Sequence, residues 1–103
     1  MSKYIYAVLL EGELLYVSDD EDEAYAFIDD HEYKSIQETA EEYDWNIYDE
    51  SEYERAALQN LIDSGGYLVE EINLRQLKKN DKYELVDGTL VDSKDILDLL
   101  KKG

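Results

Sequence analysis

The uneven distribution of charge along the chain is the feature that most constrains its fold. Residues 1–54 contain 18 Asp and Glu against only Lys3 and Lys34, whereas residues 55–103 contain nine acids and eight bases. The formal net charge of −17 therefore falls almost entirely on residues 1–54. Like charges at this density repel one another in a compact state, so most of these side chains must point into solvent.

Aromatic residues follow the same distribution as the acids. Eight of the ten Tyr, the one Trp and the one Phe lie in residues 1–54, which we call the acidic aromatic half. A disordered acidic tail would lack such residues, so this half is expected to fold. Residues 55–103 form the near-neutral half of what we predict to be a single domain, residues 1–103.

The charge also excludes several classes of function. A strongly negative field repels nucleic-acid phosphates and anionic lipids, so we expect no direct binding to nucleic acid or membrane. No run approaches the roughly 20 apolar residues of a membrane-spanning helix, and the first ten residues lack a signal-peptide cleavage site. We therefore expect a cytoplasmic protein.

The N-terminal residues predict a β-hairpin followed by three short central helices. Residues 4–10 and 14–17 are rich in β-forming side chains, and Gly12 between them permits a tight turn. Three Ser-x-x-Glu patterns with the spacing of capping boxes then follow, Ser18–Glu21, Ser35–Glu38 and Ser51–Glu54. Each precedes apolar residues at helical spacing: Ala24, Phe27, Ile28 and His31; Ile36, Ala40 and Tyr43; Ala57, Leu58, Leu61 and Ile62. Gly65-Gly66 ends the third helix.

The near-neutral half predicts strands and a final helix. Residues 67–72 favour a strand and residues 74–79 a helical turn, while strands 82–86 and 89–91 flank Asp87-Gly88 as a two-residue hairpin. Asp92 or Ser93 caps a last helix whose apolar residues, Ile96, Leu97 and Leu100, point inward. The predicted fold is α+β: an N-terminal β-hairpin, three short central helices, a mostly antiparallel sheet completed by C-terminal strands, and a C-terminal helix.

The residue types provide little for catalysis. The chain has no Cys, so it has no disulfide, thiolate metal site or thiol nucleophile. His31 is the only histidine, and we interpret it as structural. Calcium-loop registers that start at Asp19 or Asp44 fail, because Ala24 or Asp49 stands where glycine is required. With no phosphate-binding loop or nucleophile elbow, we expect no enzyme activity, cofactor or metal.

The acids of the first half predict a contact surface for a basic partner. Carboxylates on successive helices would match a cleft lined with Lys and Arg, and exposed aromatic side chains would stack on Arg guanidinium groups. The predicted partner-binding residues are Asp19, Asp20, Asp22, Glu23, Glu38, Glu41, Glu42, Asp49, Glu50 and Glu52, with Trp45 and Tyr48 as aromatic anchors. Trp45 fits a core position equally well.

In size, charge, lack of Cys and its Asp/Glu/Tyr-rich segment from Glu11 to Glu54, the chain resembles small acidic inhibitors encoded by bacteriophages. These are the anti-CRISPR and anti-restriction proteins, several of which mimic DNA. The resemblance covers about half of the chain and includes no shared motif. It implies a partner such as a Cas effector or restriction enzyme in the cytoplasm of a bacterial host.

Two alternatives remain beside the inhibitor. The chain could be an acidic protein–protein interaction or regulatory module that does not mimic DNA, or an acidic domain with a solvated helical face and an unrelated role. A homodimer would double the acidic surface, and the sequence leaves the oligomeric state open.

Overall fold

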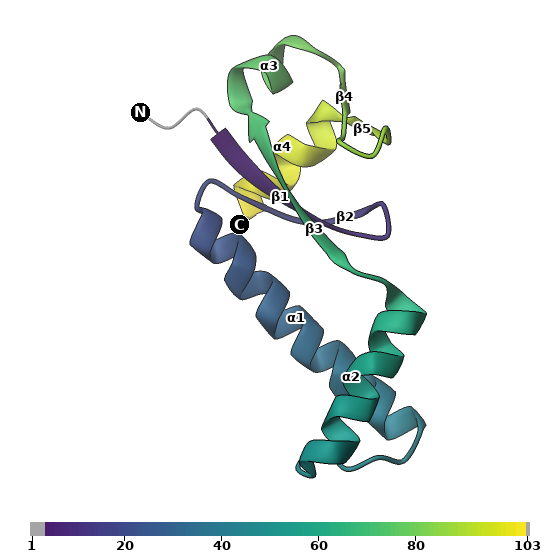
Figure 1. Ribbon diagram of the computed structural model, residues 1–103. Coiled ribbons are helices and arrows are strands. Elements are labelled where there is room, and N and C mark those ends of the chain that lie inside the picture. The colour runs from purple at the N-terminus through teal and green to yellow at the C-terminus, as the bar shows by residue number, and fades with distance from the viewer. Residues whose placement is uncertain (1–3, 103) are drawn as a thin grey trace.

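The protein is an α+β domain, described by a computed structural model over residues 4–102 (Figure 1). Its elements in chain order are β1 Tyr4–Leu10, β2 Glu13–Ser18, α1 Glu21–Glu42, α2 Glu50–Ser64, β3 Tyr67–Asn73, α3 Leu74–Lys79, β4 Lys82–Glu84, β5 Leu90–Asp92 and α4 Ser93–Lys102. The predicted α+β class, N-terminal hairpin, antiparallel pairing and C-terminal helix are confirmed.

Strand β1 lies at the centre of a three-stranded antiparallel sheet in the order β2-β1-β3. Its alternate residues Ile5, Ala7 and Leu9 are buried in the main core, together with side chains from α3, α4 and the β4–β5 hairpin. We call residues 74–102, which cover this face of the sheet, the head. The opposite face is covered by the first half of α1, so the sheet is the middle of three layers (Figure 1).

A row of aromatic side chains fixes α1 to the sheet. Tyr16 of β2 stacks on Phe27 of α1 with ring centroids 4.6 Å apart, and Phe27 lies 5.5 Å from the ring of His31. Nδ1 of His31 is 2.5 Å from the hydroxyl of Tyr67 at the start of β3. His31 therefore joins α1 to β3 by a hydrogen bond.

The prediction of three short central helices is wrong in number, because the first two form one continuous helix of 22 residues. Its two apolar stripes point in directions that differ by roughly 130° at 3.6 residues per turn. The stripe containing Phe27 faces the sheet, whereas the stripe containing Ile36 and Ala40 packs against α2. The apolar stripe changes direction because the helix packs against the sheet in its first half and against α2 in its second half. This change of direction does not mark a break in the helix.

Residues 35–64, comprising the second half of α1, a loop and α2, form a helical arm that extends beyond the sheet (Figure 1). The described chain measures 49 × 26 × 18 Å and has a radius of gyration of 15.9 Å, compared with roughly 13 Å for a compact domain of this length. The arm has a small core of its own around Ile36, Ala40 and Ala56.

A polar node lies at the centre of the contact between α1 and α2. Oδ1 of the buried Asn60 accepts hydrogen bonds from the hydroxyls of Ser35 at 2.6 Å, Thr39 at 3.4 Å and Ser64 at 3.4 Å. Ser35 therefore bonds across to α2 and does not cap a second helix. Small residues such as Ala40 and Ala56 let the two helices approach closely enough for these bonds.

The capping residues of both long helices differ from the prediction. Asp20 caps α1 by accepting from the Asp22 amide at 2.9 Å, and Asp49 caps α2 by accepting from the Glu52 amide at 3.1 Å. An aspartate next to the first turn provides the same acceptor as serine and adds a charge that the helix dipole favours. The serines of the predicted boxes, Ser18 and Ser51, are consequently not the caps.

The junction between the arm and the sheet is tight. Gly65 ends α2 as predicted, with a φ of 78°. The side chain of Glu11, from the turn between β1 and β2, lies directly against it. The backbone angles of Gly65, φ 78° and ψ −170°, favour glycine at this position.

Of the predicted C-terminal strands, β3 completes the main sheet as predicted, whereas β4 and β5 do not join it. β4 and β5 form a separate two-stranded sheet, and β3 is the third strand of the main one. The connection between β4 and β5 is longer than the predicted two-residue turn at Asp87-Gly88. Leu85 is buried in the core, and its amide donates a hydrogen bond to the carbonyl of Thr89 at 2.8 Å.

A buried carboxylate holds this hairpin connection on β3. Glu70 is only 5% exposed, and its Oε1 accepts from the Val86 amide at 2.5 Å, whereas Oε2 is buried without a partner among residues 4–102. Burial raises the pKa of Glu70 above its ordinary value, the negative charge of Asp87 raises it further, and the Val86 hydrogen bond opposes both. The neutral form of Glu70 is therefore favoured in the folded state relative to the unfolded state.

We expect the substitution Asn60→Ala to reduce the free energy of unfolding by about 1–3 kcal/mol, because it removes the acceptor of the partly buried hydroxyls of Ser35 and Ser64. Urea unfolding followed by circular dichroism would measure this loss. Gln59→Ala is the matched control on the same helix: Gln59 bonds only to exposed Asp63, so the change should be within about 0.5 kcal/mol. Equal effects of the two substitutions would contradict the role given to Asn60.

We expect Glu70→Gln to gain stability relative to the natural chain as pH rises. Gln keeps the Oε1 acceptor for the Val86 amide and cannot ionise. The folded-state pKa of Glu70 is raised, so its favourable contribution is complete below the unfolded-state pKa and is lost as pH rises through the folded-state pKa. The unfolding free energy of Glu70→Gln minus that of the natural chain should therefore be more positive at about pH 8 than at about pH 4.

The control for this pH dependence is Glu84→Gln, which removes the same charge from an exposed position on β4. The difference in unfolding free energy between Glu84→Gln and the natural chain should change less with pH than the difference for Glu70→Gln. A Glu70→Gln difference that stays constant across the range would show that Glu70 titrates alike in the folded and unfolded states.

Candidate protein-binding surface

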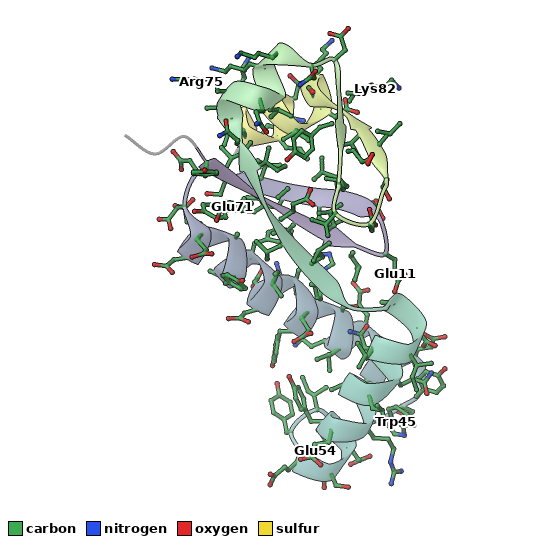
Figure 2. All side chains as sticks on the ribbon, turned by 45° about the horizontal axis from the view of Figure 1, so that its top comes forward. Glu11, Trp45, Glu54, Glu71, Arg75 and Lys82 are labelled. Atoms are coloured by element: carbon green, nitrogen blue, oxygen red, sulfur yellow. The ribbon has the colours of Figure 1, made fainter. Side chains whose placement is uncertain are left out.

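Charge is separated along the long axis of the molecule. Residues 19–63, which include α1 and the arm, contain seventeen acids and two bases, whereas the head contains six acids and seven bases. The net charges are therefore −15 and +1. In Figure 2, Arg75 and Lys82 of the head lie at one end of the molecule, and Glu54 and Trp45 of the arm lie at the other.

Most of the acidic charge is exposed and lacks a basic partner. Of the ten acids predicted to contact a partner, all are exposed except Glu52, which is half-buried. Among residues 4–102 two ion pairs form: Lys34 with Asp30 at 3.1 Å, and Lys82 with Asp92 in the head at 3.5 Å. Little of the repulsion on α1 and the arm is therefore compensated within the described chain.

The predicted contact acids fall into two groups on the structure. One group, Asp19 to Glu23, lies at the N-terminal end of α1, and the other, Glu38 to Glu52, lies at the tip of the arm. Much of α1 separates them, a distance of roughly 22 Å along the helix axis from Glu23 to Glu38. The two groups are not one compact patch, but a single straight element connects them.

Three residues that were not in the predicted set, Tyr25, Asp29 and Tyr33, continue from the predicted Asp22 into the space between these groups. Asp22, Tyr25, Asp29 and Tyr33 are spaced i, i+3, i+7 and i+11 on α1, and all four are exposed. This spacing places them in one row on the helix face that points away from the sheet. We call the exposed acids and tyrosines between Asp19 and Glu42 the acidic ridge. The sequence analysis did not identify this row because it divided α1 into two helices at Ser35.

Two of the predicted contact residues have structural roles. The carboxylates of Asp20 and Asp49 are the N-caps of α1 and α2. Their substitution would weaken the helices that carry the surface. The acids of the set that are exposed and cap no helix, such as Glu38, Glu41 and Glu42, are better probes of binding.

The two predicted aromatic anchors have different environments. Trp45 is half-buried, stacks on Tyr43 with ring centroids 4.9 Å apart, and packs against the arm core, so the structure assigns it mainly to that core. Tyr48 is 89% exposed in the loop between α1 and α2, where its amide donates to Oδ1 of Asn46 at 3.0 Å. Tyr48 is therefore the aromatic side chain of the pair that a partner could cover.

Helix α2 presents an apolar face to solvent. Leu58, Leu61 and Ile62 are 61%, 53% and 69% exposed, while Ala56 and Asn60 face α1. The helices approach through small and polar residues, which turns the larger side chains outward. Exposed large apolar residues that form a group are typical of an interaction surface.

The described residues show neither a metal centre nor a membrane-spanning helix. No group of three or more His, Asp or Glu side chains between residues 4 and 102 is arranged to hold a metal ion. No helix in that part of the chain is long and apolar enough to cross a membrane. The arrangement that the structure does offer is an extended acidic surface with exposed aromatic and apolar side chains beside it.

Comparisons of the chain with protein-family models, curated proteins and solved structures gave no match.

Proposed function

We propose that the protein is a non-catalytic inhibitor that occupies the basic nucleic-acid-binding cleft of a host defence protein, as anti-CRISPR and anti-restriction DNA mimics do. The observation that supports this proposal is the acidic ridge, whose carboxylates surround one helix of 22 residues and, apart from the Asp30–Lys34 pair, have no ion-pair partner among residues 4–102. Because the ridge is part of a regular element, its charges are held in place before a partner arrives, which reduces the entropic cost of binding.

The density of charge on the ridge supports mimicry of nucleic acid. Residues 19–42 contain eleven acids and one base. At 1.5 Å per residue they extend over about 36 Å, which gives about one carboxylate every 3 Å. Double-stranded DNA carries one phosphate per roughly 1.7 Å of axis, and a single strand one per roughly 3.4 Å. The ridge therefore has a line density of charge similar to that of one DNA strand.

The ridge also offers contacts other than charge. The exposed rings of Tyr25 and Tyr33 alternate with Asp22 and Asp29, so guanidinium groups from a cleft could stack on a ring while they pair with a carboxylate. Electrostatic attraction would speed association at low salt and slow it at high salt.

A competition assay tests the proposal. A purified Cas effector or restriction enzyme is bound to fluorescent target DNA, and the protein is added at increasing concentration. We expect it to displace the DNA at low salt and to lose affinity as salt is raised, because released counterions contribute to binding in a basic cleft. Binding without displacement of DNA, or no binding at low salt across both enzyme classes, would contradict the proposal.

Charge reversal at the end of α1 separates a contact role from a folding role. Glu38→Lys, Glu41→Lys and Glu42→Lys together should weaken competition by at least about tenfold, equivalent to about 1.4 kcal/mol. The same variant should be as stable as the natural chain or more stable. The reason is that α1 has no base in its last turn, where the helix dipole favours positive charge.

The matched control for this variant reverses three exposed acids of the head, Asp81→Lys, Glu84→Lys and Asp98→Lys, which changes the net charge equally. Competition should fall much less than in the α1 variant. Thermal unfolding monitors the fold of both proteins. An equal loss of competition in the two variants would show that net charge, and not the ridge, determines binding.

The apolar face of α2 favours a second candidate function, a regulatory module that binds a protein without mimicking DNA. Leu58, Leu61 and Ile62 would form the apolar centre of such an interface. Under this hypothesis affinity for the partner should be nearly independent of salt and should fall in the double variant Leu58→Ser, Ile62→Ser. Both side chains are exposed, so stability should change by only about 0.5 kcal/mol.

Titration of the two α2 substitutions against any partner found in the competition assay distinguishes the candidates. The inhibitor proposal expects the α1 charge reversal to have the larger effect on affinity. A larger effect of the α2 substitutions, with weak salt dependence, would favour the regulatory module.

A further inference from the structure

A pocket of about 420 Å³ lies where the N-terminal end of α1 meets β1 and the C-terminal end of α4. Its walls come from four parts of the fold that are distant in sequence. The lining residues are Tyr4, Ile5, Ser18, Asp19, Glu23, Leu74 and Leu100. The pocket is at the sheet end of the acidic ridge, about 30 Å from the arm tip along α1.

The pocket combines apolar walls with an acidic rim. Ile5 belongs to the main core, and the partly buried Leu74 and Leu100 pack against that core. Asp19 and Glu23 are the charged residues of the lining, and both are exposed. The ring of Tyr4 is 43% exposed beside them. An occupant must therefore have an apolar body and a positively charged end.

The position of one rim carboxylate is fixed by a hydrogen bond. The hydroxyl of Ser18, which is 3% exposed, donates to Oε2 of Glu23 at 2.8 Å and accepts from the Asp20 amide at 3.0 Å. Glu23 is thus held close to the sheet instead of extending into solvent. A carboxylate that is already oriented loses less entropy when it pairs with a cation.

The end of α4 adds further negative potential. The last carbonyls of a helix carry a partial negative charge, and α4 ends at Lys102, two residues after Leu100 in the pocket wall. The side chains of Lys101 and Lys102 line other hollows, on the far sides of α4. The described lining therefore contains two acids and no base, and it includes Leu100 from the last turn of α4.

We propose that this pocket binds an arginine side chain presented by the basic partner, an inference that rests on the proposed function. The aliphatic stem of arginine would lie against Leu74 and Leu100, as long charged side chains commonly lie on apolar surface. Its guanidinium group would pair with Asp19 and Glu23 at the rim. The planar, weakly hydrated guanidinium can also stack on the Tyr4 ring, which a lysine ammonium does less well.

An anchored arginine would give the interface an orientation. Carboxylates on the ridge attract any basic surface, but repeated charges along a helix do not fix its position along a cleft. One arginine in a pocket at the end of the ridge would fix both the register and the direction of α1 in the cleft. Specific contacts of this kind, near desolvated pockets, usually provide much of the binding energy at an interface.

The test titrates the full chain with N-acetyl-arginine amide while backbone amide signals are recorded by NMR. N-acetyl-citrulline amide, which has nearly the same shape without the charge, and N-acetyl-lysine amide are the comparison probes. We expect saturable shifts centred on Ile5, Ser18, Leu74 and Leu100 with the arginine probe, weaker shifts with lysine, and none with citrulline. The affinity should be in the millimolar range, roughly 4 kcal/mol of binding free energy.

Glu23→Gln and Asp22→Asn form the matched pair of variants. Each removes one negative charge from the first turn of α1, but only Glu23 lines the pocket. We expect Glu23→Gln to weaken arginine binding by about tenfold and Asp22→Asn by less than about twofold. Asp19→Asn is a second pocket variant that leaves the Ser18–Glu23 bond intact, so a folding defect in Glu23→Gln would not leave the question open.

Several outcomes would overturn the inference. These are no saturable shift at the lining residues, shifts spread along α1 with equal losses in Glu23→Gln and Asp22→Asn, or equal binding of the lysine probe. The proposed function is tested separately by the DNA competition assay. If Glu23→Gln and Asp19→Asn compete with DNA as well as the natural chain does, the pocket has no part in an otherwise valid inhibitor. Arginine binding without any DNA competition would leave the pocket but remove the proposed function.

Discussion

The structure depends on one helix that packs against two different partners. The first half of α1 places Ala24, Phe27 and His31 on the sheet, and the second half places Ile36 and Ala40 on α2. Because both contacts belong to one continuous helix, the arm is held rigidly with respect to the sheet. The acidic ridge is carried by this helix and therefore has the same rigidity. A break at Ser35 would have separated the two groups of acids.

Burial of apolar side chains in the sheet and head offsets the electrostatic repulsion among the acids of α1 and the arm. Seven of the largest fully buried side chains, Ile5, Val8, Leu9, Val17, Ile72, Leu77 and Ile96, all belong to the sheet and head. The arm, in contrast, is held by small residues and by the Asn60 node. Burial of apolar area provides most of the stability of a domain, so the sheet and head support an arm whose acids repel one another. The acidic charge of the arm and the main hydrophobic core therefore lie toward opposite ends of the molecule.

Local patterns in the sequence predicted the elements well and their contacts less well. Gly12, Gly65 and the β-forming run of residues 4–10 identified the hairpin and the end of α2, because backbone conformation at such positions depends on nearby residues. The division of α1 at Ser35 was wrong because periodicity reports which face is buried and not what buries it. Helical spacing likewise did not show whether Leu58 and Ile62 are buried, and both are exposed. The exposed acids were predictable from charge alone, whereas the pocket at Glu23 required residues from β1, α1, α3 and α4 to meet.

The separation of charge along the molecule would orient it toward a basic partner as well as attract it. With −15 on residues 19–63 and +1 on the head, the molecule would turn its α1 and arm toward a basic surface before contact. Long-range attraction of this kind acts on the whole ridge and is weakened by salt. The pocket acts only at short range, where stem and guanidinium can be desolvated together. Orientation by the ridge followed by selection at the pocket would let a small acidic domain distinguish one basic cleft from the many basic surfaces in a cell.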